Sequence, residues 1–171
     1  MMTSAQNRRL GSATLEMTLV GIPLIFVLIS TVEMARGMWI YHTLAYALRE
    51  GTRYAIVHGA NCKLAQNSCT VTVGQIATVV QNAAPGLYDA ANFQIEMQSL
   101  TDDTGLISLT SALASATVFP SAGGDAIAAP ITFTATYPFD SAIAMFWPGA
   151  GRGMSFTNVT FPASSQEEIQ F

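Results

Sequence analysis

The sequence predicts an α+β protein in which one long N-terminal transmembrane helix continues into a small domain with a short helix packed on an antiparallel sheet. Three observations lead to this prediction. Residues 17–32 carry no charge and are mostly apolar, residues 33–58 contain no proline, and three later segments alternate apolar with polar residues. A long apolar run indicates a membrane helix, whereas alternation over a few residues indicates strands.

The composition excludes two classes of protein. With 171 residues, of which 50% are apolar and 11% charged, the chain is too apolar for a disordered protein and is typical of one partly embedded in lipid. The net charge of −4 offers no basic patch, so no nucleic-acid partner is expected. About 110 residues follow the first 60, which is enough for one modest core.

The N-terminal helix is expected to cover residues 12–58, with its membrane part at about 12–32. A segment of roughly 20 residues spans the hydrocarbon core of a bilayer. Pro23 lacks a backbone donor and is expected to kink the membrane part. Glu33 and Arg36 are spaced to form an ion pair on one face of the helix.

Three aromatic residues follow the apolar run, and they allow two interpretations. Trp39, Tyr41 and Tyr46 suit an aromatic belt at the outer membrane interface. Alternatively, they pack beneath the globular domain.

Residues 59–171 are predicted to form the α+β domain. Apolar residues at helical spacing place a short helix at residues 72–84, ended by a Pro-Gly pair. Alternation predicts strands at 93–98 and 131–137, and a third strand at 154–161 requires a bulge because its apolar residues change parity.

The rest of this domain is expected to lie mostly outside the core. Residues 101–130, which are rich in Ser, Thr, Ala and Gly, are expected to form a long connection outside the core, with short strands at 106–109 and 117–119. Residues 140–153 are predicted to be a connecting loop, and residues 166–168 to be a solvated tail.

Cys62 and Cys69 are the only cysteines, and a short polar loop separates them. Such a loop can close by a disulfide in an oxidising compartment such as the periplasm. Two free thiols are the alternative. Because arginines flank both ends of the apolar run, this cysteine pair decides the orientation: the N-terminus is expected in the cytoplasm and the C-terminal domain in the periplasm.

No constellation for catalysis, a metal or a cofactor is visible. His42 and His58 are far apart on the predicted helix, with no carboxylate placed to orient either as a base. Asp102, Asp103 and Asp125 lack the alternating ligands of a calcium loop. The chain is therefore expected not to be an enzyme, and no cofactor, metal or small-molecule substrate is expected.

Glu16 stands at the head of the apolar run, where a charge needs an explanation. An acidic side chain at the bilayer centre costs about 2.5–3.5 kcal/mol on insertion scales. Glu16 must therefore lie at the interface, be protonated, or be paired with a cation.

A short basic leader, Gly11, and Glu16 as the fifth residue after it resemble the prepilin-peptidase site of type IV pilin-like proteins. Further residues make this resemblance specific to one family. They are Pro23, Glu33, Arg36 and the run Ala-Leu-Arg-Glu-Gly-Thr-Arg-Tyr-Ala that starts at position 47. Together these residues resemble the TadE-like family of minor pilins or pseudopilins of tight-adherence pilus systems. The similarity covers roughly residues 8–58, about a third of the chain.

The resemblance implies a pilin-like fold and a structural or assembly subunit of a tight-adherence (Flp-type) pilus. A prepilin peptidase would remove residues 1–11 by cleaving between Gly11 and Ser12. The implied partners are the inner membrane, this peptidase, other pilin-like subunits and pilus assembly platform proteins, with the cell surface as the location after assembly. The implied residues of helix packing and assembly are Glu16, Gly21, Pro23, Glu33 and Arg36.

In this interpretation, the new amine of an adjacent processed subunit neutralises Glu16, and the small residues Ser12, Ala13 and Gly21 let helices approach closely. The alternative is a membrane-anchored periplasmic ligand-binding module with an uncleaved signal anchor. Replacing the helix by an unrelated membrane segment distinguishes the two, because only the second function survives that exchange.

Overall fold

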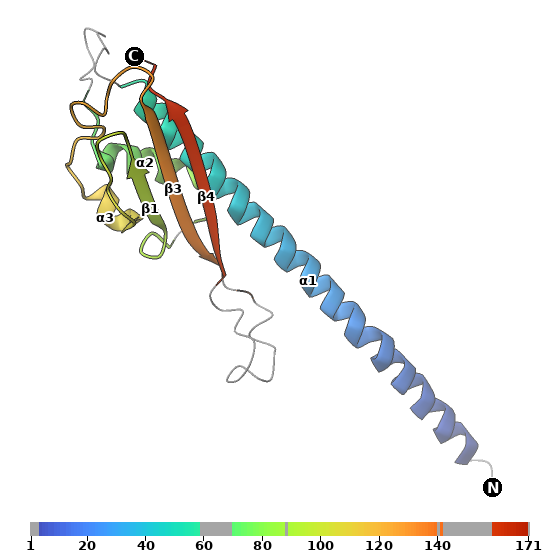
Figure 1. The fold of residues 1–171 in the computed structure, drawn as a ribbon. Coiled ribbons are helices and arrows are strands. Elements are labelled where there is room, and N and C mark those ends of the chain that lie inside the picture. Colours follow the sequence, from blue (N-terminus) through green and yellow to red (C-terminus); the bar gives the residue numbers. More distant parts are fainter. Residues whose placement is uncertain (1–3, 59–69, 88, 140, 142–158, 171) are drawn as a thin grey trace.

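The computed structural model of the chain describes residues 4–58, 70–87, 89–139, 141 and 159–170. In this part of the chain, a long helix leads into a small domain of two short helices and one antiparallel sheet (Figure 1). The predicted α+β class, with a long apolar N-terminal helix, is confirmed.

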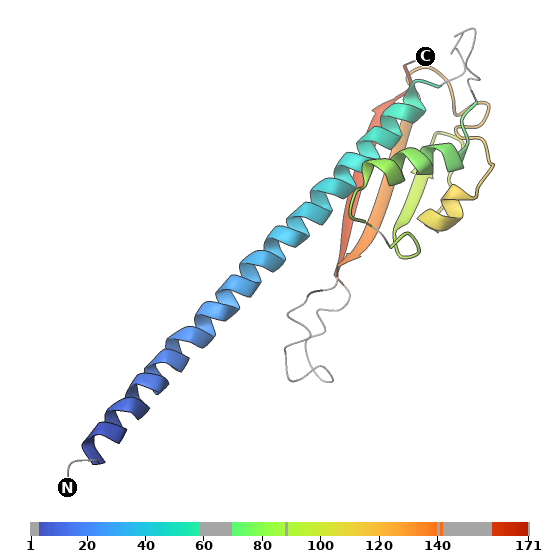
Figure 2. The ribbon, with the colours of Figure 1, turned by 180° about the vertical axis from the view of Figure 1, so that it is seen from behind.

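Helix α1 runs from Ser4 to Ile56 without a break. Its 53 residues correspond to about 80 Å at the rise of an α-helix. It begins earlier than the expected residue 12 and ends slightly before the expected residue 58. The N-terminal part of α1 projects away from the domain, and its C-terminal part lies along the sheet (Figures 1 and 2). Pro23 lies inside this helix, which continues on both sides of it.

Helix α2 comprises Val73–Ala83 and confirms the predicted short helix. It begins with a capping box at Thr72 and Gln75. The backbone N–H of Gln75 donates to Thr72 Oγ1 at 3.3 Å, and the backbone N–H of Thr72 donates to Gln75 Oε1 at 3.1 Å. These reciprocal bonds satisfy two amides that a helix start otherwise leaves without partners.

The sheet contains four antiparallel strands in the order β2-β1-β3-β4. Their bounds are Gln94–Gln98 for β1, Ile107–Ser108 for β2, Pro130–Phe139 for β3 and Val159–Glu168 for β4. The predicted strands at 93–98 and 131–137 are thus confirmed as β1 and β3.

Helices α1 and α2 cover one face of this sheet (Figure 2). In β3, Ile131, Phe133 and Ala135 are buried, while the intervening threonines are only half-buried. Strand β1 shows the same alternation. The domain therefore has two layers, and its core lies between the helices and the apolar face of the sheet.

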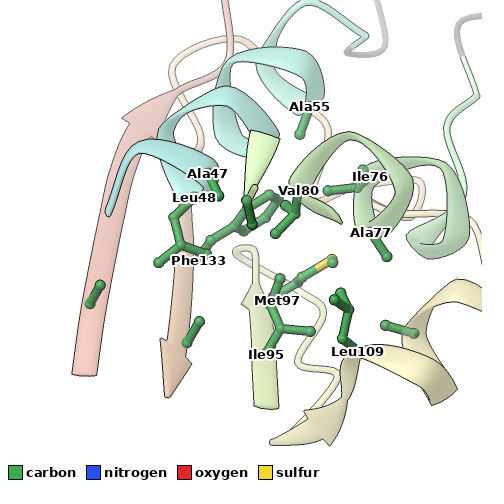
Figure 3. Packing of buried hydrophobic residues seen from close by; sticks show 14 of the residues in the cluster. Ala47, Leu48, Ala55, Ile76, Ala77, Val80, Ile95, Met97, Leu109 and Phe133 are labelled. Carbon is green, nitrogen blue, oxygen red and sulfur yellow. The ribbon is translucent and has the colours of Figure 1, made fainter. Parts of the chain in front are cut away.

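The core draws on every layer of the domain, as Figure 3 shows. The side chains labelled there come from α1 (Ala47, Leu48, Ala55), α2 (Ile76, Ala77, Val80), β1 (Ile95, Met97), β3 (Phe133) and a short helix after β2 (Leu109). The C-terminal third of α1 is consequently part of the globular fold.

The prediction for residues 101–130 was wrong in one respect. Helix α3, Leu109–Leu113, occupies part of this stretch, and Leu109, Ala112 and Phe119 are buried. The Ser108 side chain caps α3 by accepting a hydrogen bond from the backbone N–H of Ser111 at 3.2 Å. A segment rich in Ser and Ala hides such a helix, because few of its residues are large enough to show an apolar period.

Two strand predictions need correction. Only Ile107–Ser108 of the segment 106–109 is a strand, and the segment 117–119 contributes a single bridge between Val118 and Thr72. Strand β4 continues to Glu168, so residues 166–168 are strand and not a tail. Their pairing with β3 extends the sheet toward the buried Ile169. The side chains of Gln166 and Glu168 are nevertheless exposed, as expected of solvated residues.

Several predictions lie outside the described residues. These are the cysteine pair Cys62 and Cys69, the bulge near residues 157–158, and nearly all of the connecting loop 140–153.

Candidate functional site

The N-terminal half of α1 presents an apolar surface that no other described part of the chain covers. The stretch Ala13–Ile56 includes an 18-residue window with a mean hydropathy of 2.1, none of which is buried inside the molecule. By length and composition, this helix is able to cross a membrane. Its exposed apolar side chains include Leu15, Leu19, Ile22, Leu24, Ile25, Phe26, Leu28 and Val32.

The described polar side chains of this segment are of two kinds: hydroxyls that bond to the helix backbone, and one exposed carboxylate. Thr18, Ser30 and Thr31 donate their hydroxyls to backbone carbonyls three or four residues earlier, at 2.8–2.9 Å. Apolar surroundings favour such internal bonds, because lipid offers no partner. Glu16 is exposed and is the single charged residue between Ala13 and Val32.

Gly21 and Pro23 lie in the same exposed segment. A methyl group added at Gly21 would meet nothing within 4 Å. The missing side chain therefore has no packing role among the described residues. Gly11 and Ser12 belong to the backbone of α1, but their side chains lie outside what the structure describes.

Glu33 and Arg36 form the predicted ion pair where the apolar segment meets the domain. Arg36 Nη1 donates to Glu33 Oε1 at 3.5 Å. The guanidinium of Arg36 also lies over the Phe139 ring, 5.1 Å from its centroid. The Arg36 side chain is 47% exposed, whereas that of Glu33 is 11% exposed. The structure thus brings together two of the five residues predicted for helix packing.

Three further residues complete this junction, and their role was not predicted from the sequence. Gly37 is buried, and a methyl group built on it would lie 3.3 Å from Phe161 Cζ. Phe161 in turn packs on Phe139, with ring centroids 5.3 Å apart. The signal in the sequence was the spacing of Glu33, Gly37 and Ile40, which share one face of a helix.

Three residues of the Arg-Glu-Gly-x-Arg-Tyr-Ala end of the motif, Gly51, Thr52 and Ala55, are buried in the core. A methyl group on Gly51 would approach Val80 Cγ2 to 2.5 Å, so a larger residue at this position would force Val80 or one of the two helices to shift. Thr52 is fully buried and donates its hydroxyl to the Leu48 carbonyl at 2.8 Å. Arg53 pairs with Glu50 at 3.7 Å on the outside of the helix. This part of the motif therefore holds the long helix to the domain.

The aromatic residues beyond the apolar run lie at the edge of the domain. Trp39, Tyr41 and Tyr46 are 63%, 45% and 56% exposed. Trp39 and Tyr46 lie beside Pro85, and Tyr41 lines a groove together with Phe161. The three rings are therefore partly covered by the domain, and each keeps a large exposed surface.

Asp102 has the most hydrogen bonds of the domain's acidic residues that the structure describes. It accepts from the backbone N–H and the hydroxyl of Ser121, both at 2.7 Å, and from the hydroxyls of Ser99 at 3.1 Å and Thr101 at 3.3 Å. Partial burial acts to raise the pKa of Asp102, but these bonds outweigh it and hold the pKa below its ordinary value. Asp102 thereby ties residues 99–102 to Ser121, which is a structural role.

The described residues contain no group of three or more His, Cys, Asp or Glu side chains that could hold a metal ion. His58 contacts the Tyr54 carbonyl through Nδ1 at 2.7 Å, and His42 packs against the ring of Tyr41. Neither arrangement pairs a histidine with a carboxylate.

Comparison with known proteins finds one family match, and it lies in the long helix. The family model described as TadE-like protein matches residues 11–53. No curated protein and no solved structure matches the chain. The match begins at Gly11, includes the exposed apolar segment and the junction, and ends at Arg53. It confirms the resemblance seen in the sequence: residues 11–53, about a quarter of the chain, are similar to the TadE-like family.

Proposed function

We propose that this chain is a minor pilin or pseudopilin, a structural or assembly subunit of a tight-adherence (Flp-type) pilus. The observation that carries the proposal is the TadE-like match over residues 11–53. The TadE-like family is associated with these pili and is structural rather than catalytic. A long helix with an uncovered apolar half and a small domain agrees with such a role.

Before assembly, the helix anchors the protein in the inner membrane. We place residues 1–11 in the cytoplasm as a leader and residues 59–171 in the periplasm as the α+β domain. An oxidising periplasm would allow Cys62 and Cys69 to form a disulfide. The single apolar helix among the described residues supports one membrane crossing.

Cleavage by a prepilin peptidase between Gly11 and Ser12 would create a new helix start. The free amine of Ser12 would carry a positive charge, and Glu16 lies four residues further along the helix. A carboxylate near the start of a helix is favoured by the helix dipole. In an apolar bundle, the amine of an adjacent processed subunit would also neutralise Glu16.

Assembly would then use the uncovered apolar half of α1. Helices of neighbouring pilin-like subunits and of the assembly platform would pack against it, with close approach at Gly21. Pro23, Glu33 and Arg36 would shape the part of the helix that leads from the membrane to the domain. Adhesion would be a property of the assembled filament at the cell surface.

The first test is N-terminal sequencing of the mature protein, with mass spectrometry of the membrane and sheared surface fractions. In cells that contain the peptidase, we expect the chain to begin at Ser12. In cells without it, we expect Met1 to Gly11 to be retained. An intact leader in peptidase-containing cells would refute the processing step.

The second test replaces Glu16 by Ala. Because the carboxylate would no longer neutralise the amine of a neighbour, we expect little of the variant in the sheared surface fraction and normal amounts in the membrane. Glu50→Ala is the matched control, since Glu50 is also a helical glutamate but lies next to the domain core. Normal assembly of the Glu16→Ala variant would refute this role.

A third test separates assembly from mere anchoring. Residues 12–32 are replaced by an unrelated transmembrane segment of equal length, and pilus formation is scored. A subunit that assembles through its helix loses function, whereas a membrane-anchored ligand-binding module with an uncleaved anchor keeps it.

A further inference from the structure

An apolar groove lies between α1 and the ends of β3 and β4, where the domain meets the apolar segment. Its volume is about 540 Å³, and its lining includes Met34, Met38, Tyr41, Phe139 and Phe161. We call it the neck groove. Met34 and Met38 are 70% and 56% exposed, which is a large apolar surface to leave in water.

The position of the neck groove relates it to the membrane. The uncharged run ends at Val32, and Glu33, which also lines the groove, is the next residue. If residues 12–32 span the hydrocarbon core, the groove lies at the level of the lipid headgroups and opens beside the acyl chains.

The polar side of the groove is formed by the Glu33 and Arg36 pair. Arg36 occupies Glu33 Oε1, whereas Glu33 Oε2 is buried and has no hydrogen-bond partner. A buried carboxylate oxygen without a donor is costly, so a donor supplied from outside the chain would be favoured. Arg36, held over Phe139, keeps almost half of its side chain exposed.

We propose that the neck groove binds a phospholipid with a primary-amine headgroup, such as phosphatidylethanolamine. The acyl chain would lie against Met34, Phe139 and Phe161. Glu33 would accept a hydrogen bond from the headgroup ammonium after a small rotation of its carboxylate, and Arg36 would bind the phosphate. A carboxylate beside a guanidinium thus matches the two charges of a zwitterionic headgroup.

A second copy of the chain fits this groove less well than a lipid does. The apolar segment that a neighbouring helix would offer, residues 13–32, contains no Lys or Arg. It would cover the methionines but would bring no cation to Glu33, and its Thr18, Ser30 and Thr31 hydroxyls already donate to backbone carbonyls. An ethanolamine lipid supplies both the apolar surface and the cation.

The test is native mass spectrometry of the full chain released from micelles that contain equal amounts of phosphatidylethanolamine and phosphatidylglycerol with matched acyl chains. We expect the wild-type protein to retain the ethanolamine lipid preferentially. Glu33→Gln should lower that retention about tenfold, which corresponds to the loss of one charge-assisted hydrogen bond. Met34→Gln, at an exposed position, should weaken retention of both lipids.

Glu50→Gln is the matched control, because Glu50 pairs with Arg53 at the same spacing but lies away from the groove. Equal retention of the two lipids by the wild type, or equal loss in the Glu33→Gln and Glu50→Gln variants, would overturn the proposal. A dimer that carries no lipid and that Glu33→Gln dissociates would overturn it in favour of a second copy. The readout does not depend on leader cleavage or pilus assembly, so its failure leaves the proposed function standing.

Discussion

The two halves of α1 belong to one continuous helix but meet opposite surroundings. From Leu15 to Val32, the large apolar side chains project outward and touch no other described element. From Leu44 to Ile56, apolar side chains are buried against α2 and the sheet. Apolar residues on a helix therefore do not by themselves reveal what covers them. In the second half the domain supplies the cover, and in the first half the cover must come from a membrane or a partner.

Removing an aromatic ring in the covered half should destabilise the protein most. Phe133→Ala should destabilise the domain by about 3–5 kcal/mol, because Phe133 is fully buried beneath α1. Thermal unfolding of the full chain in detergent, followed by circular dichroism, measures this loss.

Phe26→Ala is the matched control, since Phe26 is exposed in the uncovered half of α1. Its effect on domain unfolding should be negligible. A comparable loss of stability in both variants would mean that the apolar half of α1 also supports the domain.

A smaller effect is expected from the glycines. Gly51→Ala places a methyl group against Val80 and should cost about 1–3 kcal/mol through overpacking. The same change at Gly21 meets open space and should leave domain stability unchanged while reducing incorporation into pili.

Chemical unfolding of both glycine variants, together with the amount of each in the sheared surface fraction, checks this pair. If Gly51→Ala unfolds like the wild type, the close contact between α1 and α2 is not a requirement of the fold.

The weakest of these changes concerns the pH dependence of domain stability. It tests whether the stability of the domain is independent of the apolar half of α1. The pKa of Asp102 is lowered in the folded protein, so its contribution is present above the unfolded pKa of about 3.9. It is lost as the pH falls through the lowered folded value. Asp102→Asn should therefore cost about 1 kcal/mol at neutral pH and progressively less in acid.

Thermal unfolding between neutral and strongly acidic pH measures this difference. Asp103→Asn is the control, because the Asp103 carboxylate accepts one described hydrogen bond, from the backbone N–H of Gly105 at 2.8 Å. An Asp102→Asn deficit that persists unchanged in acid would show that the carboxylate charge is not responsible.

The elements whose pattern is local could be predicted from the amino-acid order alone. The apolar run, the absence of proline from residues 33–58, and the alternation in β1 and β3 each follow from the chain's own periodicity. The family resemblance was also carried by residues of one segment of the chain, between Gly11 and Ala55. The Glu33 and Arg36 pair was predictable, because residues three apart on a helix are neighbours.

The remaining features depend on packing between segments that are far apart in the chain. Helix α3 and the far end of β4 have weak local signals, and they exist because the sheet and the core stabilise them. The contact of Gly37 with Phe161, and the neck groove beside it, join residues more than a hundred positions apart. Periodicity gives the face on which a residue lies, but not the distant segment that packs against that face, and for this reason the junction was not visible in the sequence.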